Sequence, residues 1–170
     1  MRNSFCRISG VKKMTVKPLI LRIKRIRSNA IMPEYKSAEA AGMDVAACID
    51  DESDGSHSQL LMGPGDIAMI PTGLVLDIPP GHEVQVRPRS GMAIKHGITV
   101  VNSPGTIDSD YRGEVMVGLI NHSQERFVID HGMRIAQLVL SKVERMDVEE
   151  VVEVSDTERG ADGFGSTGDK

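Results

Sequence analysis

The 170-residue chain has no tryptophan, and only 3% of its residues are aromatic. Its two cysteines, Cys6 and Cys48, have no metal-ligand spacing and are too few for a disulfide framework. No apolar run approaches the length of a membrane-spanning helix, and the P-loop pattern GxxxxGK(S/T) is absent. The composition therefore excludes a P-loop NTPase and predicts a cytoplasmic protein without a membrane partner.

The chain also lacks long amphipathic helices. No window of helical length keeps a 3.6-residue period, and only residues 89–96 predict a short helix. Short β-branched segments take their place, and Val84 and Val86 alternate with polar neighbours as in a half-buried strand. Glycine- and proline-containing turns separate these segments. Together they predict one all-β domain, a sandwich or barrel.

Acidic residues are missing from the first 33 positions, which carry nine Lys and Arg. The remainder has 11 basic residues against 24 acids. A basic N-terminus is typical of a transit peptide or a nucleic-acid-binding arm. The alternation in residues 19–26 instead favours an edge strand with a basic outer face, preceded by an N-terminal extension at 1–14. The acidic remainder argues against a nucleic-acid polymer as partner.

The C-terminus is rich in glycine, with four glycines in residues 159–170. Such a segment does not hold a strand or helix by itself, so a frayed terminus is the simplest interpretation. Its other residues suit a second one, because glycine amides and hydroxyls wrap phosphates and an aromatic ring stacks on a base. The side chains concerned are those of Arg159, Phe164, Ser166 and Thr167.

The stretch GTIDSDYRGEV, residues 105–115, is flanked by the apolar runs ITVV and VMVGLI. Those runs are predicted to pair, with a turn at 110–113, so that backbone groups at the hairpin mouth could read a planar amide such as uracil. Tyr111 could lie against a sugar or ring, and one aspartate could take a proton from water. For this stretch alone, ordinary turn chemistry is an equally good explanation.

Three further stretches combine polar residues with small or apolar neighbours. Asp44 lies in AGMDVAA, and RPRSGMA presents Arg89, Ser90 and the Gly91 amide as a candidate phosphate site. Gln137 lies within the apolar segment RIAQL, where a buried amide needs a partner. Each stretch by itself is as typical of a plain turn, loop or strand.

Five motifs, AGMDVAA, RPRSGMA, NSPGTIDSDYRGEV, RIAQL and RGADGFGSTG, follow one another in this order. In these motifs the chain resembles the trimeric deoxyuridine triphosphatases (dUTPases) over roughly residues 15–168. The resemblance implies a jelly-roll-like β-barrel at 15–152 and a flexible C-terminal arm at 153–170. It also implies a homotrimer with active sites at the subunit interfaces.

The same resemblance implies hydrolysis of dUTP to dUMP and pyrophosphate with Mg²⁺, which limits uracil in DNA and supplies dUMP for thymidylate synthesis. Asp108 would activate the water that attacks the α-phosphorus, and Tyr111 would pack under the deoxyribose and exclude a 2′-hydroxyl. Asp44 would reach Mg²⁺ through water. Asn102 and the backbone around Thr106 and Ile107 would read uracil, and Met116 would lie close to the base.

The phosphates would be held by Arg89, Ser90, Gly91 and Gln137. The C-terminal arm of another subunit would cover the site, with Phe164 stacked on uracil. Arg159, Ser166 and Thr167 of the arm would cover the γ-phosphate, and Gly165 would also contact the substrate.

One position departs from the dUTPase pattern, because Asp162 stands where glycine is usual. We expect this carboxylate to point to solvent and to cost little. The nearest alternative is a dCTP deaminase, which shares the fold and part of the middle motifs. A non-catalytic trimeric scaffold is a second alternative. The arm and the DSDYRGE segment favour the dUTPase over both.

Overall fold

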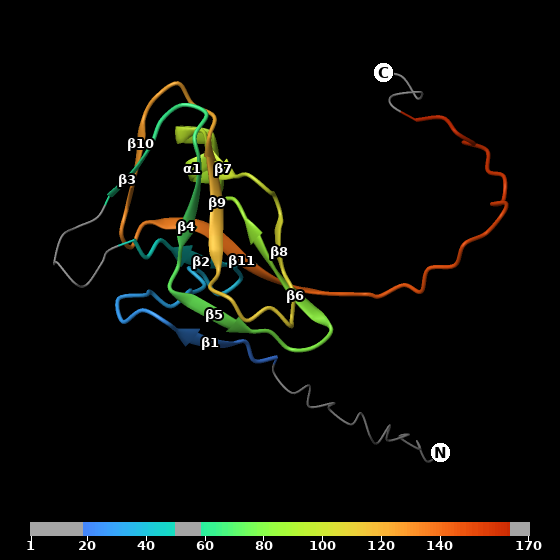
Figure 1. The fold of residues 1–170 in the computed structure, drawn as a ribbon, viewed down its shortest axis with the longest axis horizontal. Helices are drawn as coiled ribbons and strands as arrows, with labels where there is room; N and C mark the ends of the chain where they lie inside the picture. Colours follow the sequence, from blue (N-terminus) through green and yellow to red (C-terminus); the bar gives the residue numbers. More distant parts are fainter. Residues whose placement is uncertain (1–18, 50–58, 164–170) are drawn as a thin grey trace, which may run out of the picture.

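The computed structural model describes residues 19–49 and 59–163. These residues form antiparallel strands and one short helix, so the all-β prediction is confirmed (Figure 1). The predicted extension at 1–14 lies outside the described residues, as do Phe164, Gly165, Ser166 and Thr167. No helix among the described residues is long and apolar enough to cross a membrane.

The largest sheet has four strands in the order β2-β11-β6-β8. Val84 and Val86 on β6 turn into the core while Gln85 between them stays partly exposed, as the period-2 alternation predicts. β11 is the longest strand and lies between β2 and β6. The bounds are β2 (Met43–Ala46), β6 (His82–Arg87), β8 (Gly105–Ile107) and β11 (Arg134–Lys142).

A three-stranded sheet, β4-β9-β7, packs on the same core. Val117 and Leu119 of β9 are fully buried and join Val84, Val86 and Leu138 of the larger sheet in one apolar cluster. The two sheets therefore form a jelly-roll-like β-sandwich around a single core. Their bounds are β4 (Ile67–Pro71), β7 (Ile98–Val100) and β9 (Met116–Asn121).

Two small antiparallel pairs, β1-β5 and β3-β10, complete the fold. Arg22 and Lys24 on β1 are exposed, while Ile23 and the preceding Leu21 pack against the core, which confirms the predicted basic edge strand. The predicted short helix is α1 (Ser90–His96). The remaining bounds are β1 (Arg22–Arg25), β3 (Gln59–Met62), β5 (Leu74–Asp77) and β10 (Phe127–Asp130).

The chain between β7 and β9 is only partly a hairpin. β7 and β9 pair as predicted, with Val100 opposite Leu119, but β8 in the connection crosses to β6 in the other sheet. The turn predicted at 110–113 is wrong, because the Tyr111 N–H donates to the Asp108 carbonyl at 3.2 Å. Ser109 and Asp110 therefore occupy the central turn positions, and the Arg112 guanidinium binds the carbonyl oxygens of Ser109 and Tyr111.

After β11 the chain leaves the sheets through residues 143–163, with a turn at 158–161 (Figure 1). These residues hold no strand or helix, and nearly all are exposed. The boundary between domain and arm, placed at 152 from the sequence, stays a prediction. The last strand, β11, ends at Lys142, ten residues before the predicted boundary.

Candidate active site

Five predicted phosphate- and metal-site residues lie around one cavity of about 320 Å³. β2 and β11 are paired so that Asp44 lies opposite Gln137, and α1 begins next to them. We call this space the cationic cavity. Its lining residues are Lys36, Ala40, Ala41, Gly42, Asp44, Arg89, Ser90, Gly91 and Gln137.

Asp44 is the only acid that lines the cationic cavity within the described part of the chain, and it is braced by two arginines. Its Oδ2 accepts a hydrogen bond from Arg134 Nη1 at 2.8 Å, and its Oδ1 lies 3.5 Å from Arg89 Nε. Arg89 Nη1 also donates to the Arg134 carbonyl at 2.7 Å. The carboxylate is nearly buried, so these contacts are poorly screened and fix both guanidinium groups.

Arg134 is a site residue that the sequence analysis missed. It is the first residue of the RIAQL motif, in which only Gln137 was singled out. What identifies Arg134 is its position as the first residue of β11, the strand that pairs with β2, which carries Asp44. Arg134 does not line the cavity itself but contacts the single acid that does, while Lys36 and Arg89 line it and Lys36 also pairs with Glu34. Two lining cations against one lining acid suit a polyphosphate.

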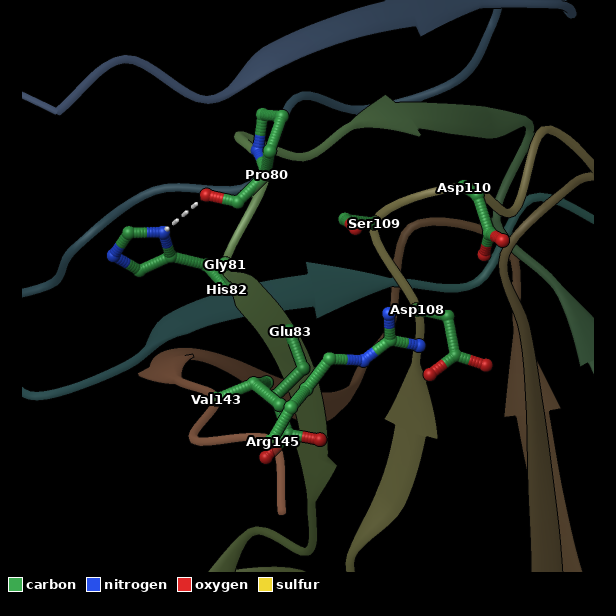
Figure 2. A pocket seen from close by; sticks show the side chains of 9 residues that line it. All are labelled: Pro80, Gly81, His82, Glu83, Asp108, Ser109, Asp110, Val143 and Arg145. Carbon is green, nitrogen blue, oxygen red and sulfur yellow. Dashed lines mark hydrogen bonds between the residues drawn. The ribbon is translucent and has the colours of Figure 1, made fainter. Parts of the chain in front are cut away.

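Asp108 lines a different cavity, of about 460 Å³, which we call the Asp108 cavity (Figure 2). Asp108 follows β8, and Arg145 reaches into the same space from the segment after β11. Within the described residues, the Asp108 carboxylate has no hydrogen-bond or ion-pair partner. No sequence pattern had indicated the other walls of this cavity, which are Pro80, Gly81, His82, Glu83, Ser109, Asp110, Val143 and Arg145.

The predicted uracil-reading residues lie on β8 and beside β9. β8 is the outer strand of its sheet, so one side of its backbone offers N–H and C=O groups that no neighbouring strand takes up. Thr106 is exposed and Ile107 points its side chain into the core, which leaves backbone as the part of Ile107 available to a ligand. Asn102 lies between Gly105 and Gly118, and Met116 begins β9 nearby.

Tyr111 is half exposed and held in a fixed orientation. Its hydroxyl donates to the Glu114 carbonyl at 3.1 Å, and its ring covers the Cα of Gly113. A Cβ at Gly113 would lie 2.2 Å from the phenol oxygen, so only glycine permits this ring position. The ring of Tyr111, predicted to bind the sugar, is therefore already positioned next to the turn that carries Asp108.

A model of the dUTPase family matches residues 28–168. The chain is 58% identical over 137 residues to the deoxyuridine 5′-triphosphate nucleotidohydrolase of Desulfotalea psychrophila, covering 81% of this chain and 87% of that protein. The chain belongs to the dUTPase family. Its identity to the enzyme of the same name from Syntrophotalea carbinolica is 49% over 153 residues, or 90% of this chain and 99% of that one.

The fold agrees with a solved dUTPase structure. The dUTPase of Staphylococcus bacteriophage 80alpha, solved with dUpNHpp, superposes with a TM-score of 0.72 at 26% identity. The match covers 88% of this chain and 98% of the phage protein. The family match at 28–168 includes both cavities and extends into the C-terminal motif.

In this dUTPase chain the two cavities share no residue and lie well apart. Asp44, Gln137 and Arg87 form one row across the sheet, whereas Ile107 pairs with Val84. Asp108 thus lies about four residues along the strands and three strands across the sheet from Asp44. With ~3.3 Å per residue and ~4.8 Å per strand, the two aspartates are roughly 20 Å apart. One chain therefore does not bring Asp108 to the cationic cavity.

The donor set fits Mg²⁺ held mainly by a bound polyphosphate. Among the described residues, no three His, Cys, Asp or Glu side chains gather into a metal cluster. The cationic cavity offers the Asp44 carboxylate alone, and its oxygens already face two arginines. Mg²⁺ keeps several waters and needs few protein carboxylates when phosphates supply oxygens, so one indirect ligand is sufficient.

Proposed function

We propose that this dUTPase hydrolyses dUTP to dUMP and pyrophosphate in active sites shared between copies of the chain in a homotrimer. The observation that carries the proposal is the pair of complementary half-sites, a cationic cavity in one place and a base-reading strand with a free aspartate in another. Family membership supports the substrate. The cytoplasmic location predicted from the composition belongs to the same proposal.

The cationic cavity would bind the triphosphate. Arg89 and Gln137 offer hydrogen-bond donors, and Ser90 adds a hydroxyl at the start of α1. Arg134 acts through Asp44, because it holds the carboxylate that in turn orients Arg89. When bound with the nucleotide, Mg²⁺ would neutralise charge on the phosphoryl groups, with Asp44 as its water-mediated protein ligand.

The strand β8 and the turn after it would hold the nucleoside. Backbone groups at Thr106 and Ile107 would pair with the edge of uracil, as an added strand would, with Asn102 and Met116 beside the ring. Tyr111 would lie against the deoxyribose and occupy the space that a 2′-hydroxyl needs. In this arrangement the sugar and base are read by rigid backbone and one fixed ring.

Asp108 would act as the general base. Its carboxylate accepts a proton from water while the water oxygen forms a bond to the α-phosphorus. The bond from that phosphorus to the bridging oxygen breaks, and pyrophosphate leaves with the electron pair. A carboxylate without protein partners in the described chain is free to take up this water.

The separation of the half-sites is the reason for a shared site. A general base must lie within hydrogen-bond reach of its water, and roughly 20 Å of sheet lies between Asp108 and Asp44 within one chain. A second copy closes this gap if its β8 edge faces the cationic cavity of the first. The arm, with Arg159 and the proposed contacts of Phe164, Gly165, Ser166 and Thr167, would reach the site from a neighbour.

The test is pyrophosphate release from dUTP with Mg²⁺, measured beside UTP, dTTP and dCTP. Turnover should be confined to dUTP, and Asp108→Asn should lower kcat by about 10²–10⁴-fold, the usual contribution of a general base. Asp110→Asn is the matched control, since it removes a carboxylate from the same cavity two residues away. Ammonia release from dCTP would identify a deaminase, and a folded protein without dUTP turnover would identify a scaffold.

A further inference from the structure

Glu114 is the centre of a contact network that the predicted site does not include. Its Oε1 accepts the Gly73 N–H at 2.7 Å, and its Oε2 accepts a hydrogen bond from Arg27 Nη2 at 3.2 Å. Arg27 also donates through Nη1 to the Cys48 carbonyl at 3.1 Å. The Glu114 side chain is only 18% exposed, so this ion pair is better shielded from solvent than an ordinary surface pair. We call this network the Glu114 clamp.

The clamp continues into the next residue. The Val115 N–H donates to the Leu74 carbonyl at 2.8 Å, and the Thr72 hydroxyl donates to the Val115 carbonyl at 2.7 Å. Thr72 is fully buried. Gly73 adopts a φ of +70°, and a Cβ there would lie 2.6 Å from the Ala30 Cβ, so glycine is needed for its amide to reach Glu114. The segment 114–115 is thereby fixed to the corner between β4 and β5.

Tyr111 depends on this segment for its position. Its hydroxyl donates to the Glu114 carbonyl at 3.1 Å, and its ring lies over Gly113. The ring is half exposed, and the contacts that hold it come from Glu114 of the clamp and from the preceding Gly113. A movement of residues 113–114 would therefore move the ring with it.

We propose that Arg27 and Glu114 are positioning residues that set the preference for a deoxyribose over a ribose nucleotide. The inference rests on the proposed function, in which Tyr111 packs against the sugar. Exclusion of a single hydroxyl by a ring is steric, so a displacement of about 1 Å is enough to relax it. The cationic cavity does not contact the clamp residues, so phosphate binding should be preserved.

The kinetic test compares kcat/KM for UTP and dUTP in Arg27→Gln with the wild type. We expect the UTP:dUTP ratio to rise by about tenfold, mainly because UTP turnover increases. Arg25→Gln is the matched control, since it removes the same charge from the same edge of the molecule without touching Glu114. Arg27→Lys should restore part of the preference by keeping the ion pair. Glu114→Gln, which can still accept the Gly73 amide, is a second variant should Arg27→Gln fail to fold.

A second readout does not depend on catalysis. The chain has no tryptophan and two tyrosines, so Tyr35→Phe leaves Tyr111 as the only intrinsic fluorophore of this class. Time-resolved anisotropy of that protein without nucleotide reports motion of the Tyr111 ring. Adding Arg27→Gln or Glu114→Gln should increase the fast component, and adding Arg25→Gln should leave it unchanged.

The outcomes separate this inference from the function on which it rests. A wild-type protein that does not hydrolyse dUTP overturns the proposed function, while the anisotropy still decides whether the clamp fixes Tyr111. Folded Arg27→Gln and Glu114→Gln proteins that keep the wild-type UTP:dUTP ratio overturn the inference alone. A raised ratio with a more mobile Tyr111 supports it.

Discussion

The two aspartates that face the cavities, Asp44 and Asp108, are held in opposite ways. Asp44 lies within a strand, nearly buried, and contacts two arginines, one of them 90 residues away in the chain. Asp108 lies at a turn, is exposed, and has no partner among the described residues. The first aspartate organises cations around it, and the second is left available for a ligand or a water.

This difference indicates how the work of the site is divided. The walls of the cationic cavity described here all come from one chain, and the pairing of β2 with β11 and the ion pairs of Asp44 hold them in place. The Asp108 cavity has a turn and the beginning of the arm as walls, and Figure 2 marks one hydrogen bond among its residues, between His82 and Pro80. This division suits a site shared by two chains, in which one chain supplies the rigid cationic cavity and the other supplies the open Asp108 cavity.

The largest expected effect is recovery of activity by mixing two inactive variants. Asp108→Asn and Arg89→Ala should each lower kcat/KM by about a hundredfold or more. If Asp108 and Arg89 serve one site from different chains, co-refolding equal amounts should return about one quarter of wild-type activity, because random assortment leaves that share of sites intact. The measurement is pyrophosphate release before and after mixing. Mixtures no more active than the separate variants would place both residues in one chain's site.

A smaller effect is expected when Asp44 loses its hydrogen bond from Arg134. Arg134→Ala removes the 2.8 Å contact and leaves a nearly buried carboxylate with Arg89 alone. We expect KM for dUTP to rise by about tenfold with a smaller change in kcat, since one charge-assisted hydrogen bond is worth about 1.5–3 kcal/mol before solvent screening. Binding of inorganic triphosphate, followed by calorimetry, should weaken in parallel. Arg126→Ala, an arginine away from both cavities, is the control.

A still smaller effect is expected on the nucleoside side, where kcat rather than KM should change. Arg112 binds the carbonyl oxygens of Ser109 and Tyr111 and contacts Asp77 at 3.2 Å. Arg112→Gln should loosen the turn that carries Asp108 and lower kcat by about three- to tenfold, because general-base catalysis depends on position. Arg22→Gln is the control, as Arg22 approaches the same Asp77 carboxylate without reaching the turn. Weaker triphosphate binding in Arg112→Gln would contradict the division into two half-sites.

Local sequence patterns predicted much of this molecule. The alternation at 84–86, the basic edge strand at 19–26 and the short helix at 89–96 depend on neighbouring residues, and the structure has all three. The turn was misplaced by two residues because Asp, Ser and Gly favour several turn positions equally. Arg134, Arg145 and the Glu114–Arg27 pair were missed, since their partners are set by strand pairing between distant segments. The distance between the two cavities could not be predicted for the same reason, because it also depends on how distant strands pair.

The smallest expected effect concerns Asp162, where the dUTPase motif usually has glycine. Asp162 is exposed, and its backbone forms a turn with Arg159, whose Nε donates to the Asp162 carbonyl at 2.8 Å. This contact uses the backbone, so it survives in Asp162→Gly, and the carboxylate is free to stay in solvent. We expect kcat/KM for dUTP to change by no more than about twofold, because exposed charges are strongly screened. A rise of about tenfold or more would mean that the carboxylate lies close enough to bound phosphates to repel them. In that case the Asp162 side chain, and not only the proposed contacts of Arg159, Ser166 and Thr167, would face the phosphates bound in the cationic cavity.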